Sequence, residues 1–275
     1  MLKFFFTIED LLRIILRANY QSRKIIGTPG CNRKLRILGN GKSLNDESLA
    51  DNSNVDYMVV NRHVLADNYQ TIKPRYYVFA DPFFFNNPKG VDILRQINEL
   101  TSWPMTVMIP YSRGIKKEYS QLFSNSNIIL KTYNIFSFQG YTSIAYWCYD
   151  HQLAMPVAQN VIVGAIMMGI SMKYHTIELY GVEHDWLRHL YVGDDNLVYL
   201  ENDHFYDKEK VKPLPQKEIQ HLDEYPLYMN IGHYARMFQS YWEIKKYIND
   251  RKIATRIINM TKHSFIDAFE RRITC

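Results

Sequence analysis

One stretch of the sequence decides the fold: Leu35-Arg36-Ile37-Leu38-Gly39-Asn40-Gly41-Lys42-Ser43-Leu44. Residues 34–38 are short and mostly apolar, which is typical of a strand in a sheet that is covered on both faces. The two glycines indicate a tight break after this strand. Ser43 is a residue type that caps helices, so a helix is expected to follow. A strand, a glycine turn and a helix in this order predict one unit of a parallel α/β sheet.

The rest of the chain repeats this alternation. Further short, apolar strands are predicted at residues 57–60, 76–80, 105–109, 176–180 and 254–259. Residues 161–172 are nearly all apolar and predict a buried helix, residues 233–250 return to helical spacing, and a last helix is expected from Ser264. The pattern predicts an α/β, Rossmann-like domain with a mainly parallel sheet and helices on both faces.

The expected organisation has three parts. Residues 1–30 form an N-terminal amphipathic helix and a linker, and residues 31–182 with 230–275 form the nucleotide-binding core. Residues 183–229 are polar, aromatic and irregular. So long an irregular stretch inside a compact domain is usually functional, and it is interpreted as a small irregular or helical lid that binds the acceptor.

The N-terminal segment has the features of an amphipathic helix. Thr7 and Asp10 resemble a capping box, and apolar residues recur after it at helical spacing, namely Ile8, Leu11, Leu12, Ile15 and Leu16. Such a helix either lies on a membrane surface or packs on the main domain. A secretory signal is not indicated, because charged residues interrupt the apolar start and no small-residue cleavage site follows.

Composition narrows the classes of partner. The 275 residues fit one large domain, and the net charge of 33 − 28 = +5 suits an anionic ligand or an anionic membrane surface. No basic run with interleaved aromatics predicts a nucleic-acid partner. Three widely spaced cysteines suggest neither a disulfide framework nor a zinc site. A cytoplasmic protein is expected.

Polar residues stand at the ends of four predicted strands. They are Asn40, Asn61, Asp81 and Glu183. In an open parallel sheet, ligands bind beyond the carboxyl ends of the strands. Side chains of this kind hydrogen-bond a ribose, a base edge or sugar hydroxyls. Gly39 and Gly41 would let the backbone approach a nucleotide, and the helix after Ser43 would attract phosphate.

Two better-known glycine motifs are excluded. A dinucleotide fingerprint needs a third glycine where Leu44 stands, and a P-loop needs a glycine where Arg36 stands. An ordinary tight turn remains the alternative interpretation of Gly39-Asn40-Gly41.

Four segments, taken in order, carry a resemblance to a known family. They are residues 37–44 (Ile-Leu-Gly-Asn-Gly-Lys-Ser-Leu), residues 59–62 (Val-Val-Asn-Arg), residues 160–183 with Ile177-Glu178-Leu179-Tyr180-Gly181-Val182-Glu183, and Ile231-Gly232-His233 with residues 259–265. Together they resemble the bacterial lipooligosaccharide sialyltransferases, glycosyltransferase family 42. The resemblance runs from about Leu35 to Glu270.

The resemblance implies roles for individual residues. Asn40 and Asn61 would hold the nucleotide, and His233 would be the general base that deprotonates the acceptor hydroxyl. Tyr191 falls where the family has a tyrosine that stabilises the departing phosphate, and the family's other such tyrosine falls at about Asp185. Asp81 stands where the family has an asparagine, and Lys42 stands where it has a proline. A lysine beside the expected phosphate suggests a donor that carries more negative charge.

The remaining candidate positions leave alternatives open. Gly181 belongs to the matched strand end, and Asn160 either contacts the nucleotide or caps the buried helix. Trp186, Arg188 and His189 are candidates for substrate contacts in the lid, and Arg188 either pairs with a carboxylate or phosphate or lies on the surface.

The implied activity is transfer of a sugar from a nucleotide donor to a hydroxyl of a glycan or lipid-linked oligosaccharide. A CMP-linked sialic acid or related sugar is favoured, with inversion, no cofactor and no metal. Asp194-Asp195 lacks the Asp-x-Asp spacing of metal-dependent transferases. The product would belong to a capsule or lipopolysaccharide, made on the inner face of the cytoplasmic membrane. A UDP- or CDP-linked donor, a non-catalytic nucleotide-binding subunit and a homo-oligomer all remain open.

Overall fold

The computed structural model describes residues 2–20, 33–47, 49, 54–111, 121–201, 213–220 and 222–271. The helices are α1 (Leu2–Arg17), η2 (Lys42–Asp46), η3 (His63–Leu65), α2 (Tyr69–Ile72), α3 (Phe83–Asn86), α4 (Pro88–Leu100), α6 (Thr142–Asp150), α7 (Val161–Ser171), η4 (Trp186–Arg188), α8 (Gln216–Ile219) and α9 (Leu227–Asp250). The strands are β1 (Lys34–Leu38), β2 (Val55–Val60), β3 (Tyr76–Val78), β4 (Met105–Pro110), β5 (Ile128–Tyr133), β6 (Thr176–Tyr180), β7 (Leu190–Val192), β8 (Val198–Leu200), β9 (Leu214–Pro215), β10 (Arg256–Asn259) and β11 (Glu270–Arg271).

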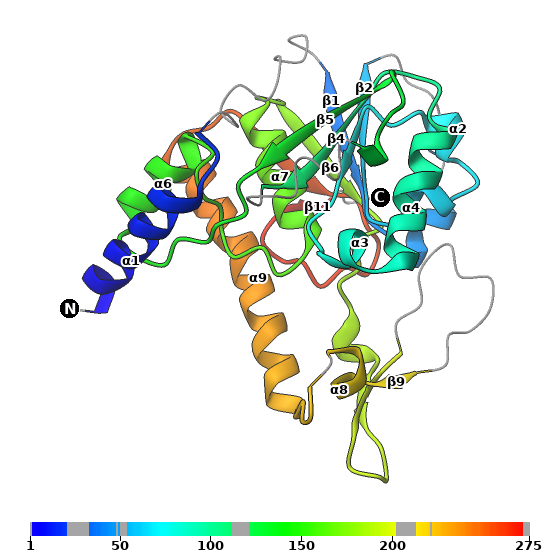
Figure 1. Ribbon diagram of the computed structural model, residues 1–275. Coiled ribbons are helices and arrows are strands. Elements are labelled where there is room, and N and C mark those ends of the chain that lie inside the picture. The colour runs from blue at the N-terminus through cyan, green and yellow to red at the C-terminus, as the bar shows by residue number, and fades with distance from the viewer. Residues whose placement is uncertain are drawn as a thin grey trace.

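The main sheet has eight strands in the order β11-β10-β6-β1-β2-β3-β4-β5 (Figure 1). Every neighbouring pair in this sheet is parallel. From β1 the chain winds outward through β2 to β5, and then returns to the other side of β1 as β6. The order therefore reverses between β1 and β6, where doubly wound sheets place their ligand crevice. The predicted parallel α/β fold is confirmed.

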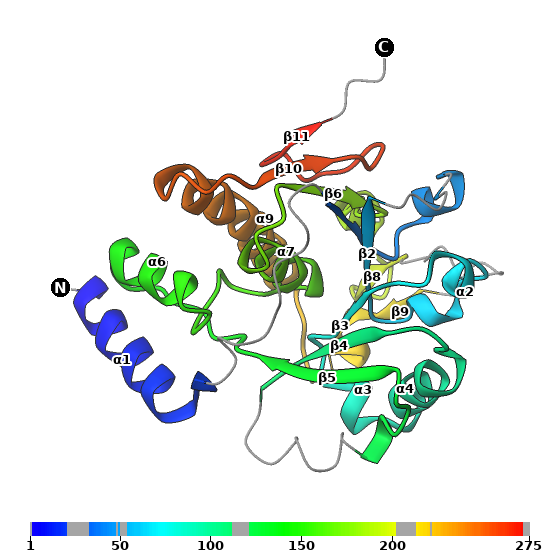
Figure 2. The same cartoon turned by 90° about the horizontal axis from the view of Figure 1, so that it is seen from above.

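Helices cover both faces of this sheet (Figure 2). Alternate strand residues point to opposite faces, so Leu35 and Ile37 join one buried cluster with α6, α7 and α9. Leu38 and Val59 join the other cluster, which contains residues of α2 and α4. The first ten residues of α7 are all buried, as the apolar run at residues 161–172 predicts.

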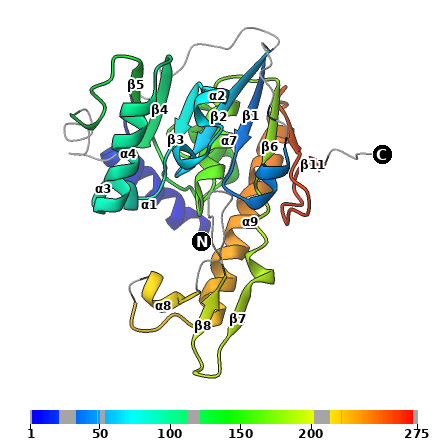
Figure 3. The same ribbon diagram turned by 90° about the vertical axis from the view of Figure 1, so that its right-hand side faces the viewer.

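The β7–β8 hairpin projects from one end of the sheet beside the first turns of α9 (Figure 3), and it belongs to the predicted lid, of which the structure describes residues 183–201, 213–220 and 222–229. The described part of the lid contains η4, α8 and a small antiparallel sheet in the order β7-β8-β9. Helix α9 begins at Leu227, six residues before the predicted start. His233 consequently lies inside the helix, in its second turn, and not at a helix start.

The predicted last helix from Ser264 was wrong. Residues after β10 are tied to the end of β6 by hydrogen bonds that a helix would not allow. The Ser264 hydroxyl donates to the Val182 carbonyl at 2.7 Å, and the Phe265 amide donates to the Glu183 carbonyl at 2.7 Å. The chain then forms β11, which pairs with β10 at the edge of the main sheet.

The expected capping box at Thr7 was also wrong, because α1 begins at Leu2. Thr7 lies inside the helix, and its hydroxyl donates to the Lys3 carbonyl at 2.7 Å. The same hydroxyl accepts from the Tyr141 amide at 2.9 Å, so Thr7 attaches α1 to the segment before α6. The predicted linker at residues 21–30 lies outside the described residues. Within the described part of the chain, no helix is both long and apolar enough to cross a bilayer.

A buried carboxylate joins the amino ends of the central strands, opposite the crevice. Asp56 is 3% exposed and accepts hydrogen bonds from Arg33, Arg75 and the Tyr174 hydroxyl. Burial alone would raise the pKa of Asp56, but the hydrogen bonds from Arg33 and Tyr174 outweigh it and hold the pKa below its usual range. The carboxylate is thus charged at neutral pH and fixes β2 to its neighbours.

Replacing Asp56 by asparagine is expected to lower the free energy of unfolding by about 2 kcal/mol. The loss stays moderate because Arg33 and Arg75 are partly exposed and water can solvate them. Urea denaturation would measure it. The matched control is Asp92→Asn, which breaks the exposed Arg95–Asp92 pair and is expected to change stability by less than about 0.5 kcal/mol. Equal effects of the two substitutions would contradict a structural role for Asp56.

Candidate functional site

The Gly39-Asn40-Gly41 turn lies at the reversal of strand order, pressed against the end of β6. The Gly39 amide donates to the Tyr180 carbonyl at 2.8 Å, and the Gly41 amide donates to the Gly181 carbonyl at 2.9 Å. A Cβ atom on Gly39 would lie 2.2 Å from the Gly181 oxygen. Close packing of the two strand ends therefore requires glycine at position 39, whereas at Gly41 an added Cβ would meet the Glu183 carboxylate. The expectation that these glycines let the backbone approach a nucleotide stays a prediction.

Glu183 occupies the beginning of the helix that follows this turn. Its Oε1 accepts from the Ser43 amide at 2.6 Å, and Gly41 is the N-cap of η2 without a side-chain hydrogen bond. The predicted cap by Ser43 was wrong, because Ser43 lies within η2. A carboxylate at this helix start also replaces the phosphate that was expected there.

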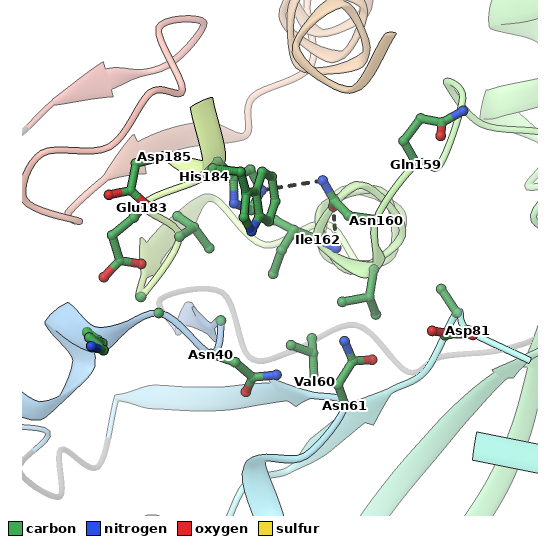
Figure 4. A pocket seen from close by; sticks show the side chains of 18 of the residues that line it. Asn40, Val60, Asn61, Asp81, Gln159, Asn160, Ile162, Glu183, His184 and Asp185 are labelled. Atoms are coloured by element: carbon green, nitrogen blue, oxygen red, sulfur yellow. Dashed lines mark hydrogen bonds between the residues drawn. The ribbon is translucent and has the colours of Figure 1, made fainter. Parts of the chain in front are cut away.

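A cavity of about 970 Å³ opens beyond the carboxyl ends of β1, β2, β3 and β6. Figure 4 shows Asn40 and Asn61 on one side of it and Asn160, Ile162 and His184 on the other. Most predicted site residues line this larger cavity: Gly39, Asn40, Gly41, Asn61, Asp81, Asn160, Gly181, Glu183, Asp185, Trp186 and His189. The structure thus brings together the residues that were expected at the strand ends.

Three residues that line the floor of the larger cavity carry a side-chain oxygen for which the described residues supply no hydrogen-bond donor. These oxygens are Asn40 Oδ1, Asn61 Oδ1 and Glu183 Oε2, and each is a buried atom. Asn61 has a φ of 53°, a left-handed conformation that asparagine tolerates better than most residues. Buried acceptors without partners are unfavourable unless a ligand supplies donors. Hydroxyl, amino or ring N–H groups fit this floor.

The opposite wall begins with the amino end of α7. Asn160 is the N-cap of this helix, and its Oδ1 accepts from the amides of Ile162 at 2.9 Å and Val163 at 3.2 Å. The capping role of Asn160 is confirmed, and the residue lines the cavity as well. The partial positive charge of the helix amino end favours an anionic group on this side.

The charged residues of the lining are mostly acidic. Among the described lining residues, Lys42 is the one lysine or arginine, against the carboxylates of Asp81, Glu183, Asp185 and Glu201. The formal balance is 1 − 4 = −3. This balance disfavours a ligand that carries many negative charges. It therefore argues against the more highly charged donor that Lys42 suggests in the sequence.

His184 connects the cavity to an aromatic stack. It is buried, with a φ of 51°, and its Nε2 lies 2.6 Å from the Tyr241 hydroxyl. Burial lowers the pKa of His184 to about 3, so the imidazole is neutral at physiological pH. Its ring stacks on Trp186 at 4.6 Å between centroids, and Trp186 stacks on Tyr234 at 5.6 Å. Neutral aromatic surfaces of this kind suit the apolar faces of sugar rings.

His233 lines a second, smaller cavity of about 320 Å³ and not the larger one. The two cavities share Gln159, Asn160 and Trp186 as a common wall. Gln216 and Asn230 line the smaller cavity and are 4% and 3% exposed. Within the part of the chain that the structure describes, Gln216 Nε2 and Asn230 Nδ2 have no hydrogen-bond partner. The smaller cavity therefore offers two buried donors to a polar ligand.

The imidazole of His233 is held by a phenol. Its Nδ1 lies 2.5 Å from the Tyr225 hydroxyl. Burial, and then the nearby charge of Arg236, lower the pKa of His233 below its usual value of 6.5. Burial raises the pKa of Tyr225, so the phenol stays protonated. When Nδ1–H donates to the Tyr225 oxygen, Nε2 carries the lone pair that a general base needs.

Three predicted residues line neither cavity: Ser43, Arg188 and Tyr191. Tyr191 is 43% exposed on β7, where its ring stacks on Tyr199 at 5.4 Å. The Arg188 guanidinium lies over the Phe265 ring at 5.0 Å. Tyr191 is not among the lining residues of either cavity, and its ring lies against Tyr199 of the neighbouring strand β8 instead. Arg188 is exposed, so of its two alternatives the surface position is the one observed.

Sequence reasoning missed Gln216, Tyr225 and Asn230. One signal was present for Asn230, which stands three residues before His233 and so shares its helix face once α9 begins at Leu227. Gln216 and Tyr225 come from the irregular lid, and only tertiary structure places them.

Among the described residues, no group of three or more His, Cys, Asp or Glu side chains is arranged to hold a metal ion. Comparisons of the chain with protein-family models, with curated proteins and with solved structures find no match.

Proposed function

We propose that this protein is a glycosyltransferase that moves a sugar from a nucleotide donor in the larger cavity to a hydroxyl in the smaller one. The observation that carries the proposal is the pair of adjoining cavities with a shared wall. One cavity, at a switch point of the sheet, is lined by residues whose acceptor atoms have no partner among the described residues, and the other is lined by an imidazole held by a phenol. A two-substrate transfer needs two adjacent sites and a base that reaches the acceptor hydroxyl.

The donor that fits best is a nucleoside monophosphate sugar, with CMP favoured. The acceptor atoms of Asn40, Asn61 and Glu183 suit ribose hydroxyls and the exocyclic amino group of cytosine, and uracil has no such amino group. The acidic lining favours one phosphate over two. The amino end of α7 would lie beside that phosphate, where a helix start stabilises developing negative charge.

The reaction follows from these placements as a single displacement. Nε2 of His233 takes the proton of the acceptor hydroxyl while the oxygen attacks the anomeric carbon. The bond from that carbon to the phosphate oxygen breaks, and the nucleotide leaves with the electron pair. Attack from the side opposite the leaving group inverts the anomeric carbon. Gln216 and Asn230 would orient the acceptor by donating hydrogen bonds to its oxygens.

A nucleotide screen by thermal unfolding tests the donor assignment. Because a ligand that binds only the folded state stabilises it, CMP at about 100 times its Kd adds about 2.7 kcal/mol, or roughly 5 °C in the unfolding midpoint. The double variant Asn40→Ala/Asn61→Ala is expected to lose this shift. The control Asn249→Ala removes an exposed asparagine near the end of α9 and is expected to keep it.

The same screen has outcomes that count against the proposal. A larger shift with UDP than with CMP would replace the cytidine assignment by a uridine one. No shift with any nucleotide would remove the donor site. If CMP binds, release of CMP from a CMP-sugar in the presence of a glycan, with and without EDTA, then tests transfer and its predicted independence of metal.

A further inference from the structure

Three polar side chains from separate elements meet at the wall of the larger cavity. They are Asn160 at the amino end of α7, His184 after β6 and Tyr241 of α9, and Tyr241 is fully buried. The Tyr241 hydroxyl lies 2.6 Å from His184 Nε2, and Asn160 Nδ2 donates to that hydroxyl at 3.0 Å. Figure 4 shows Asn160 and His184 pointing toward one another across this wall. His184 has no part in the displacement described above.

The hydrogen bonds of this cluster determine which nitrogen of His184 carries the proton. Asn160 Oδ1 accepts from two backbone amides of α7, so Nδ2 of the same amide faces the cluster, where it lies 3.4 Å from His184 Nε2. Burial raises the pKa of Tyr241, so its hydroxyl keeps a proton. The acceptor for that proton is His184 Nε2 at 2.6 Å, which is closer than Asn160 Oδ1 at 3.3 Å. His184 Nε2 therefore accepts, and the proton of the neutral imidazole is on Nδ1.

The Nδ1–H group of His184 is available to a ligand. The side chain lines the larger cavity although the residue is only 8% exposed. The hydrogen bonds of the ring all involve Nε2, and none of the described residues accepts from Nδ1. Burial lowers the pKa of His184 to about 3, so the imidazole remains a neutral donor at physiological pH. A nearly buried donor without an acceptor in the protein is unfavourable until a ligand supplies one.

The surroundings of this donor favour an anionic oxygen. The first turn of α7 lines the larger cavity together with His184, and the amino end of a helix carries a partial positive charge. Figure 4 places the carboxylates of Glu183 and Asp185 on the side of His184 that faces away from Asn160. The region between Asn160 and His184 thus combines a helix amino end with a fixed N–H donor. This combination is typical of phosphate sites.

Hydroxyl side chains do not offer an alternative donor for such a phosphate. The described lining residues of the larger cavity include no serine, threonine or tyrosine. A phosphate beside α7 must therefore be held by N–H groups, and His184 carries the one whose direction the protein fixes through Tyr241.

We propose that His184 binds the phosphate of the nucleotide donor through Nδ1–H, and that Tyr241 is the positioning residue that keeps the proton on this nitrogen. The inference rests on the proposed function, because it assigns the donor phosphate a place in the larger cavity. As the bond from the anomeric carbon to the phosphate oxygen breaks, the electron pair passes to that oxygen. The hydrogen bond from Nδ1–H strengthens with the added charge, and its proton stays on the imidazole. Neutral imidazoles stabilise developing anions in this way.

A comparison of CMP with cytidine isolates the phosphate, because the two ligands differ only in that group. Calorimetry gives both Kd values, and their ratio measures the preference for CMP. His184→Phe removes the N–H group and keeps a ring beside Trp186, and it is expected to reduce this preference at least about tenfold. His184→Asn places an amide nitrogen where Nδ1 stands, and asparagine tolerates the φ of 51°. This variant is expected to retain most of the preference.

Tyr241→Phe tests the positioning role. Without the phenol, the imidazole proton is expected to distribute over both nitrogens, whereas nitrogen NMR of the unmodified protein should show it on Nδ1 alone. The preference for CMP should fall less than in His184→Phe. The matched control is Tyr247→Phe, which removes another buried hydroxyl of α9, hydrogen-bonded to Asp150 at 2.8 Å. This control is expected to change neither the proton position nor the preference.

The possible results distinguish this role of His184 from the donor site itself. CMP binding with an unchanged preference in His184→Phe would overturn the role and leave the donor site in place. A proton on Nε2 of His184 in the unmodified protein would overturn it as well, and that measurement does not depend on any variant folding. Failure of both CMP and cytidine to bind would remove the donor site and the role of His184 together.

Discussion

Replacing His233 by alanine is expected to lower kcat for sugar transfer by about 10²- to 10⁴-fold and to leave nucleotide binding intact. His233 lines the smaller cavity and not the larger one. Its loss should therefore remove the base without disturbing the donor. Steady-state kinetics of transfer and the thermal shift with CMP measure the two effects separately. His175→Ala is the matched control. His175 is exposed and directly precedes the amino end of β6, whereas the site lies at the carboxyl ends of the strands.

The pH dependence of transfer follows from the lowered pKa of His233. The base acts only when its imidazole is neutral, so kcat/KM falls as the pH drops through this pKa. Because the pKa lies below 6.5, the acid limb of the profile should also lie below pH 6.5. Tyr225→Phe removes the acceptor for Nδ1–H, and we expect a smaller loss of kcat than in His233→Ala, with a displaced acid limb. Unchanged turnover of His233→Ala would remove His233 from the mechanism.

The sequence predicts the centre of the sheet well because each central strand is a short apolar run that ends in a glycine or a polar residue. Residues 34–38 and 176–180 coincide with β1 and β6 in the structure. Strand β5 was missed, because its pattern of buried and exposed residues reflects its position at the edge of the sheet. The last helix was predicted wrongly, because the hydrogen bonds of Ser264 to a distant strand override local propensity.

The candidate site also has one part that the sequence predicts and one part that it does not. Asn40, Asn61 and Glu183 could be placed together from the sequence, since parallel strands bring their carboxyl ends to one edge. The smaller cavity could not be predicted from the sequence, because Gln216 and Tyr225 belong to the predicted lid and only the tertiary structure brings them beside His233. Tyr191 shows the limit of transferring a role by position: its ring is used in a stack with Tyr199 on the hairpin. Tyr191 therefore has an environment that differs from the one implied by the family tyrosine at the corresponding place in the chain.

Gly39→Ala is expected to lower the free energy of unfolding by about 4 kcal/mol, among the largest effects of any single methyl group in this protein. The added Cβ would lie 2.2 Å from the Gly181 carbonyl oxygen and 2.8 Å from Val182 Cγ1. The nearer atom is backbone and belongs to the end of a central strand, so relief requires β1 and β6 to separate. That separation would break the 2.8 Å hydrogen bond from the Gly39 amide to the Tyr180 carbonyl and displace Asn40 from the cavity floor. Urea denaturation measures the stability, and the CMP thermal shift measures the loss of the donor site.

Gly232→Ala supplies the matched control, because the chemical change is identical and the surroundings differ. A Cβ on Gly232 would meet only Arg236 Nη1 at 3.8 Å, an ordinary contact with a flexible side chain. Gly232 lies inside α9, where alanine is favoured over glycine by up to about 1 kcal/mol. The two substitutions are therefore expected to have opposite signs. If Gly39→Ala were as stable as the unmodified protein and still bound CMP, close packing of the two strand ends would no longer explain the glycine at position 39. Its role would then have to be sought in direct contact with the ligand.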